Sequence, residues 1–192
     1  NAIAAQVGAS PRLTMEAVIV PAPAPDVVVD PLSWFDSPGR FELEIGCGKG
    51  RFLLHRARSR PDVRLLGIEW ANKFYTYAAD RMARWGVTNV RVMRTDAGVF
   101  VMRNLPPLCL SALHVYHPDP WPKKRHHKRR LIQTPFIDAA IRCTKPAARW
   151  LIQTDHAEYF AWIRERLDAR TELIERPFED PTFGPGEDWA GT

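Results

Sequence analysis

One stretch of this sequence decides the fold: Phe41-Glu-Leu-Glu-Ile-Gly-Cys-Gly-Lys-Gly-Arg51. It indicates a short apolar strand, a turn with glycine at every second position, and the start of a helix. Glycines let a ligand approach the backbone and a helix N-terminus favours anionic groups, so the stretch predicts a nucleotide-type site. A dinucleotide fingerprint needs glycine at its sixth position, where Arg51 stands, and this disfavours a nicotinamide-dependent oxidoreductase.

Apolar runs rich in β-branched residues alternate with helical patterns along the rest of the chain. This alternation predicts an α/β fold with a mostly parallel, doubly wound sheet. One helix ends at Gly86, and another has Thr134 as its N-cap and Pro135 at its first helical position. We expect strands at residues 41–45, 63–69, 90–94, 110–116 and 150–154, and helices in the gaps, among them 72–85, 134–143 and 157–167.

Acidic residues close or follow four of these strands. Ligands of open α/β sheets bind outside the carboxyl ends of the strands, so these acids are expected to meet at one edge. They are Glu69, Asp96, Asp119 and Asp155.

A second informative stretch is His117-Pro-Asp-Pro-Trp-Pro-Lys-Lys-Arg-His-His-Lys-Arg-Arg130. Its prolines fix φ and remove backbone donors, which predicts a stiff loop that holds Asp119 and Trp121 in set directions. The chain has a net charge of +5, and without the six cations of residues 123–130 this falls to −1. Such a concentrated basic patch favours nucleic acid binding, with a solvated run or a localisation signal as the alternative.

Composition and length predict one globular domain, because 45% of the 192 residues are hydrophobic and 26% are charged. We expect this domain at residues 39–192, behind a proline-rich tail at 1–38 that covers it as an extended segment. The sequence has no secretion signal or apolar run long enough to cross a membrane, and its three cysteines lack metal-ligand spacing. These features predict a cytoplasmic protein without a metal centre. We expect both ends to continue in the natural protein, and the sequence leaves monomer and homodimer open.

Together these motifs closely resemble the bacterial tRNA (guanine-N7)-methyltransferase family. The resemblance runs in one order from about residue 41 to 155 and rests on the glycine stretch, the segment 117–130 and three shorter motifs: Gly67-Ile-Glu69-Trp, Asp96-Ala and Gln153-Thr-Asp155. It implies a Rossmann-like class I methyltransferase domain at residues 39–192, S-adenosylmethionine as cofactor and tRNA as partner. The implied product is 7-methylguanine in the variable loop of tRNA.

The resemblance also implies roles for individual residues. Glu44 would attract the positively charged methionyl part of the cofactor, Glu69 would accept from the ribose hydroxyls, and Asp96 from the adenine amino group. The cofactor-binding set is Glu44, Gly46, Gly48, Gly50, Glu69, Asp96 and Asp119. Asp119 is also the expected catalytic residue, and Lys123 and Asp155 are expected to contact the substrate. The expected RNA contacts are Arg125, His126, His127, Lys128, Arg129 and Arg130.

Two departures from the family pattern stand out. His117 occupies a position that is usually aromatic, and the Thr-x-Phe/Tyr-Glu substrate motif near the C-terminus is not visible, although we expect Thr192 to be its first residue. The last strand pair of the sheet is then expected to be incomplete. Two other functions stay open: an adenine-N6 methyltransferase, and a non-catalytic RNA-binding protein on a methyltransferase fold. For two residues a purely structural role is the alternative to a functional one: Asp119 would cap its loop, and Trp121 would pack on the sheet.

Overall fold

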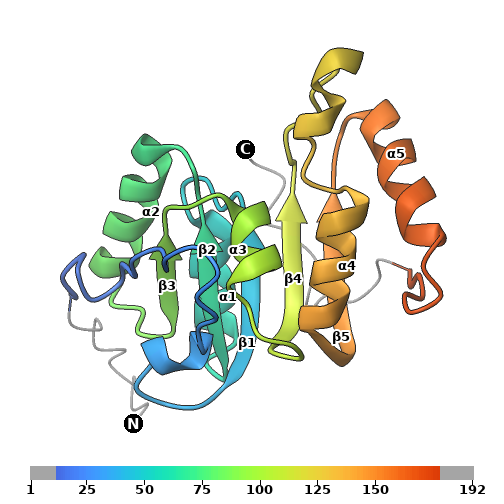
Figure 1. Cartoon of the computed structure of the whole chain (residues 1–192). Coiled ribbons are helices and arrows are strands. Elements are labelled where there is room, and N and C mark those ends of the chain that lie inside the picture. Colours follow the sequence, from blue (N-terminus) through green and yellow to red (C-terminus); the bar gives the residue numbers. More distant parts are fainter. Residues whose placement is uncertain (1–11, 178–192) are drawn as a thin grey trace, which may run out of the picture.

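The computed structural model of the chain describes residues 12–177. Figure 1 shows a central sheet with helices on both faces. The described elements, with η for a 3-10 helix, are η1 (Pro31–Trp34), β1 (Arg40–Ile45), α1 (Arg51–Ser59), β2 (Val63–Ile68), α2 (Asn72–Arg84), β3 (Val90–Met93), α3 (Ala97–Arg103), β4 (Leu110–Tyr116), η2 (Lys124–Arg129), α4 (Thr134–Cys143), β5 (Thr144–Gln153) and α5 (Ala157–Asp168).

The five described strands form one parallel sheet in the order β3-β2-β1-β4-β5. The chain moves outward from β1 to β3 and then returns to the other side of β1 with β4. The strand order therefore reverses between β1 and β4, which is where open α/β sheets bind their ligands. The predicted doubly wound α/β fold is confirmed.

Two hydrophobic cores lie on opposite faces of the sheet. Alternate residues of β1, among them Leu43, pack with α3, α4 and α5, whereas α1 and α2 cover β2 and β3 on the other face. Strands buried on both faces need apolar residues at consecutive positions, which β2 shows at Leu65-Leu66 and β4 at Ala112-Leu113. The remaining residues of β1 on the α1 side are Glu42 and Glu44, two acids inside a buried strand.

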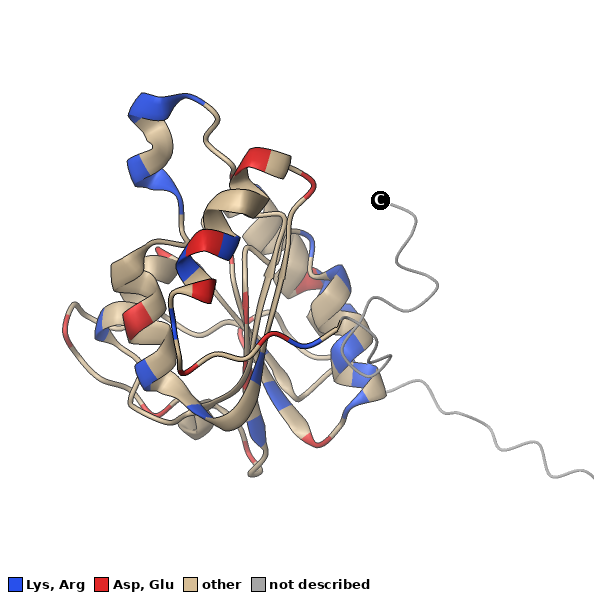
Figure 2. Cartoon of the chain, turned by 90° about the vertical axis from the view of Figure 1, so that its right-hand side faces the viewer, with Lys and Arg blue, Asp and Glu red and all other residues tan. Residues whose placement is uncertain are grey.

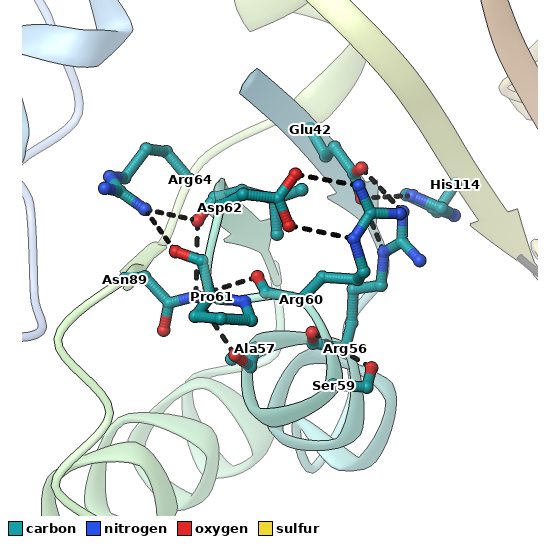
Figure 3. A network of polar contacts seen from close by, with 11 residues as sticks. Glu42, Arg56, Ala57, Ser59, Arg60, Pro61, Asp62, Arg64, Asn89 and His114 are labelled. Carbon is teal, nitrogen blue, oxygen red and sulfur yellow. Dashed lines mark hydrogen bonds and ion pairs between the residues drawn. The ribbon is translucent and has the colours of Figure 1, made fainter. Parts of the chain in front are cut away.

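A buried ion-pair network pins α1 to the sheet (Figure 3). The Arg56 guanidinium donates two hydrogen bonds to Glu42, at 2.9 and 2.7 Å. The Nε2 atom of His114 lies 3.1 Å from the same carboxylate, and its Nδ1 lies 3.0 Å from the Tyr116 hydroxyl. Burial raises the pKa of Glu42, but the hydrogen bonds from His114 and Arg56 outweigh it and hold that pKa at about 2. An ionised Glu42 only accepts, so Nε2 of His114 carries the proton.

Several element boundaries differ from the expected ones. The end of α2 is as predicted, with Gly86 at a positive φ of 60° just after Trp85. The N-cap of α4 is Gln133, so Thr134 is already helical, which corrects the expected cap. Strand β5 begins at Thr144, six residues before the predicted start. Its first half is largely exposed and lacks the apolar pattern that marks a buried strand.

Part of the segment 12–38 covers the outer edge of the sheet beside β3. Val18 and Val20 are buried, and Val92 of β3 exchanges backbone hydrogen bonds with both of them, at 2.9 and 3.1 Å. Further along, the Asn104 side chain donates to two carbonyls of this segment. The segment turns at residues 16–18, at residues 25–26 and at residues 31–34, where the Asp30 side chain caps η1 and Pro31 opens it. The tail is therefore not extended throughout, which corrects the expectation from the sequence.

Within residues 12–177, no helix is long and apolar enough to cross a membrane. Thr192 and the rest of the expected substrate motif lie outside the described residues. An incomplete last strand pair therefore remains a prediction.

Candidate functional site

The glycine loop between β1 and α1 is an open backbone cradle. Gly46, Gly48 and Gly50 all have positive φ, at 73°, 52° and 70°. A methyl group added at Gly46 or Gly48 would meet no atom within 4 Å, so space stands open above the loop. At Gly50 the added group would lie 3.1 Å from Ala78 and Met82 of α2. Gly50 therefore serves close helix packing, and the first two glycines leave room for a ligand.

Glu69 fixes the shape of this loop from the end of β2. Its carboxylate accepts hydrogen bonds from the backbone N–H of Gly48 and of Ala71, each at 2.9 Å. The first bond ties the glycine loop to β2, and the second holds the N-terminus of α2. Each carboxylate oxygen keeps a second lone pair for a ligand hydroxyl.

Glu44 is a buried carboxyl group with an oxygen left unpaired. Its side chain lies on the α1 face of β1, and its Oε2 has no hydrogen-bond partner. Burial, with a smaller contribution from the charge of Glu69, raises the pKa of Glu44 to about 8. A buried unpaired oxygen beside an open loop is a ready acceptor for a cationic or N–H-bearing ligand group.

Asp96 has a structural role in addition to its expected one. It is exposed and caps α3, where its Oδ1 accepts from the backbone N–H of Val99 at 3.0 Å. The predicted acid after the third strand is thus fixed in direction at the carboxyl edge of the sheet.

The loop after β4 holds strained backbone. His117 and Trp121 have positive φ values of 50° and 45°, which non-glycine residues seldom adopt. Asp119, which lies between them and is flanked by prolines, is exposed. His117 donates its backbone N–H to Gln153 at 2.8 Å, and its Nδ1 lies 3.6 Å from Asp155. This contact joins the loop to the end of β5, so the structure brings Asp155 beside the Pro-Asp-Pro segment.

The basic segment, residues 123–130, contains η2 and projects beyond the sheet. Figure 2 shows the projecting segment with Lys and Arg at both of its ends. Within it, Trp121 packs edge-on against His126, with ring centroids 5.9 Å apart, and the Arg129 guanidinium lies 5.0 Å from the Trp121 ring centre. Trp121 is half-buried under η2, so in this structure the segment itself covers part of its ring.

Arg130 is an exception among the predicted RNA contacts, because it is only 2% exposed. Its guanidinium donates to the Pro120 carbonyl at 2.8 Å and to both oxygens of Glu158 at 3.1 and 2.5 Å. It also lies over the rings of Tyr159 and Trp162, 4.9 and 4.7 Å from their centres. Arg130 therefore anchors the loop to α5 and is not available to a phosphate.

The other predicted RNA contacts are more accessible. His127 is half-buried against Trp162, with ring centroids 5.4 Å apart, and its Nε2 atom is buried without a partner. His126 is half-buried beside Trp121. The exposed members are Arg125, Lys128 and Arg129, and Lys123, an expected substrate contact, is exposed as well.

Gln153 is a site residue that sequence reasoning did not select. It lies at the end of β5, and its side-chain Oε1 is buried without a partner. The signal was present, because Gln153 stands two residues before Asp155 in the motif Gln153-Thr-Asp155. In the described part of the chain, no three His, Cys, Asp or Glu side chains gather as a metal site would require.

The comparisons identify the family. The family model described as "Putative methyltransferase" matches residues 39–182. The chain belongs to this methyltransferase family. Among its relatives, the tRNA (guanine-N(7)-)-methyltransferase of Nitrosococcus oceani is 42% identical over 65% of this chain and 53% of the relative. The enzyme of the same name from Thermus thermophilus is 42% identical over 72% and 44%, and that of Corynebacterium diphtheriae is 34% identical over 78% and 58%.

The resemblance drawn from the motifs is thus confirmed, and this chain spans about half the length of the curated relatives it matches. Solved structures support the fold of the family. An O-methyltransferase of Thermotoga maritima aligns with a TM-score of 0.52 at 18% identity, over 69% of this chain and 44% of that one. A precorrin-6y C5,15-methyltransferase of Geobacter metallireducens gives 0.54 at 14%, over 68% and 63%. The fold is that of Rossmann-like S-adenosylmethionine-dependent methyltransferases.

Proposed function

We propose that this chain carries the catalytic domain of a tRNA (guanine-N7)-methyltransferase that uses S-adenosylmethionine. The observation that carries the proposal is the unpaired, buried carboxyl oxygen of Glu44 beside an open glycine loop, at the sheet edge that also bears Asp119 and the basic segment. The names of the relatives support the same activity. The domain comprises residues 39–192, and residues 1–38 are a proline-rich tail.

The residues of the glycine loop fit the cofactor. An ammonium group would give the buried Glu44 oxygen the partner it lacks, and Glu69 keeps lone pairs for two ribose hydroxyls. Open space above Gly46 and Gly48 leaves room for the bound molecule. When bound, S-adenosylmethionine supplies an electrophilic methyl group on a sulfonium centre.

Methylation of guanine N7 requires little proton transfer from the protein. Guanine N7 carries an in-plane lone pair and no proton, so it accepts a methyl group without a general base. What the site supplies is alignment of N7 and stabilisation of the positive charge that moves onto the base. The exposed carboxylate of Asp119, on a loop held by proline and by the His117 contact with Asp155, suits the second task.

The basic segment is the proposed contact with tRNA. Lys123, Arg125, Lys128 and Arg129 are exposed on the segment that projects above the site, where they can neutralise phosphates. Lys123 follows the Pro-Asp-Pro-Trp-Pro stretch directly, so it and Asp155 are the proposed contacts with the target nucleotide. We place the protein in the cytoplasm, where tRNA is modified.

Methyl transfer from radiolabelled cofactor to bulk tRNA, followed by nucleoside analysis, tests the proposal. The expected product is 7-methylguanosine. N6-methyladenosine would point to an adenine methyltransferase, and tRNA binding without transfer would point to a non-catalytic RNA-binding protein. Either of these results overturns the proposal.

A further inference from the structure

An exposed aromatic stripe runs along α2, away from the basic segment. Trp70, Phe74 and Tyr77 are 68%, 40% and 41% exposed. Phe74 and Tyr77 are three residues apart and lie on one face of α2, and Trp70 stands in the loop just before the helix. Trp70 directly follows Glu69, so the stripe starts at the edge of the candidate cofactor site. Three large exposed rings close together form an apolar patch, and such patches mark interaction sites.

Cations accompany these rings. The Arg94 guanidinium lies 5.9 Å from the ring centre of Trp70, and Lys49 of the glycine loop lies 5.9 Å from that of Tyr77. One turn further along α2, Arg81 lies 5.1 Å from the Tyr77 ring centre. Asp80, an acid on the same helix, is paired with Arg84 at 2.8 Å. The stripe therefore combines exposed ring area with positive charge.

We propose that Trp70, Phe74 and Tyr77 form a second RNA-contact surface, on which unpaired nucleotides of the substrate stack. This inference rests on the proposed function and extends it to a face that the basic segment does not reach. Aromatic rings with nearby cations suit single-stranded RNA, whose bases have flat faces and whose backbone is anionic. A self-interface fits less well, because a two-fold contact would set the same cations against each other.

Three variants test the surface in the whole protein. The double variant Phe74→Leu with Tyr77→Leu keeps apolar bulk but removes both rings. Phe74→Tyr keeps the ring, and Leu108→Ala changes an exposed apolar residue before β4, at the opposite edge of the sheet. Binding of fluorescently labelled tRNA is measured as a function of salt, and binding of S-adenosylmethionine by calorimetry.

We expect the double variant to bind tRNA about tenfold more weakly or worse. The slope of log affinity against log salt should stay that of the parent, because no phosphate contact is lost. Cofactor affinity should not change, and the two controls should match the parent. Parental tRNA affinity in the double variant, while the parent methylates tRNA, would overturn this surface alone. An equal loss of cofactor affinity, or a changed oligomeric state, would also overturn it by assigning the rings to the cofactor or to self-association. A parent that neither binds nor methylates tRNA would overturn the proposed function itself.

Discussion

Two glutamates on one face of β1 have opposite properties. Glu42 is ionised because Arg56 and His114 bind it, whereas Glu44, two residues later, keeps an oxygen without a partner. Their pKa values accordingly stand at about 2 and about 8. Two buried acids of the same strand therefore serve different purposes: the first holds the fold, and the second is available to a ligand.

Cofactor affinity should depend on pH through Glu44. Because the pKa of Glu44 is raised to about 8, this carboxyl group is protonated in the free protein below that pH. A bound ammonium group favours its ionised form. Binding should therefore release a proton, and affinity should rise between about pH 5.5 and 7.5, by up to about tenfold per pH unit. Titration calorimetry in buffers of different ionisation enthalpy measures both effects. The Glu44→Gln variant should lose this pH dependence, and a variant with the parental pH profile would exclude Glu44 from the site.

At the scale of single elements, α1 depends on its buried ion pair. Arg56→Met would leave Glu42 buried without the two hydrogen bonds of the guanidinium, and we expect it to lower the free energy of unfolding by about 3–5 kcal/mol. The matched control is Arg60→Met, which breaks the more exposed pair with Asp62 drawn in Figure 3 and should cost less than about 1 kcal/mol. Urea unfolding at pH 7 compares them, and equal losses would contradict the account.

The same ion pair should make the stability of the parent protein fall at acid pH. The pKa of Glu42 is lowered from 4.5 to about 2, so its contribution to stability is complete above about pH 4.5 and is lost as the pH falls towards 2. Unfolding free energies measured between pH 5 and 2.5 should decrease in the parent. A parent whose stability stays constant over that range would exclude an ionised Glu42.

Two adjacent arginines of the basic segment should behave differently. Arg130→Ala removes the buried hydrogen bonds to Pro120 and Glu158, and we expect it to lower stability by about 2–3 kcal/mol. Arg129→Ala should leave stability within about 0.5 kcal/mol. It should instead weaken tRNA binding and reduce the salt slope by about one. Thermal unfolding and salt-dependent tRNA binding separate the two roles. Similar losses of stability for both variants would contradict this assignment.

The limits of the sequence are clearest in these elements. Strand positions followed from apolar runs, because burial on both faces of a parallel sheet demands them. The role of Arg130 did not follow, since nothing local distinguishes it from Arg129. Its partners Glu158 and Trp162 come from α5, about thirty residues later, and only tertiary packing brings them together. The exposed half of β5 lacked a signal because only Thr144 of it pairs with β4 before the register shifts to Arg149, and an exposed strand needs no run of apolar residues.

For the molecule as a whole, the sheet order gathers the site. Because the order reverses between β1 and β4, the glycine loop and the Pro-Asp-Pro loop leave the same edge from neighbouring strands. The contact of His117 with Asp155 adds the end of β5. The positions of these acids at strand ends could be predicted, and so could their shared edge. Gln153 was not selected although it stands in the motif Gln153-Thr-Asp155. Its unpaired buried oxygen and the exposure of the aromatic stripe of α2 are properties of the folded chain and could not be predicted.

The central claim is that Asp119 stabilises the charge that develops on guanine during methyl transfer. Asp119→Asn keeps the size of the side chain and the proline frame, and it removes the negative charge. Single-turnover transfer to guanine N7 of tRNA, at saturating cofactor and tRNA, should be slower by about a hundredfold or more. The affinities for cofactor and tRNA should change much less. A variant that transfers methyl at the parental rate would contradict the claim and leave Asp119 as a cap of its loop.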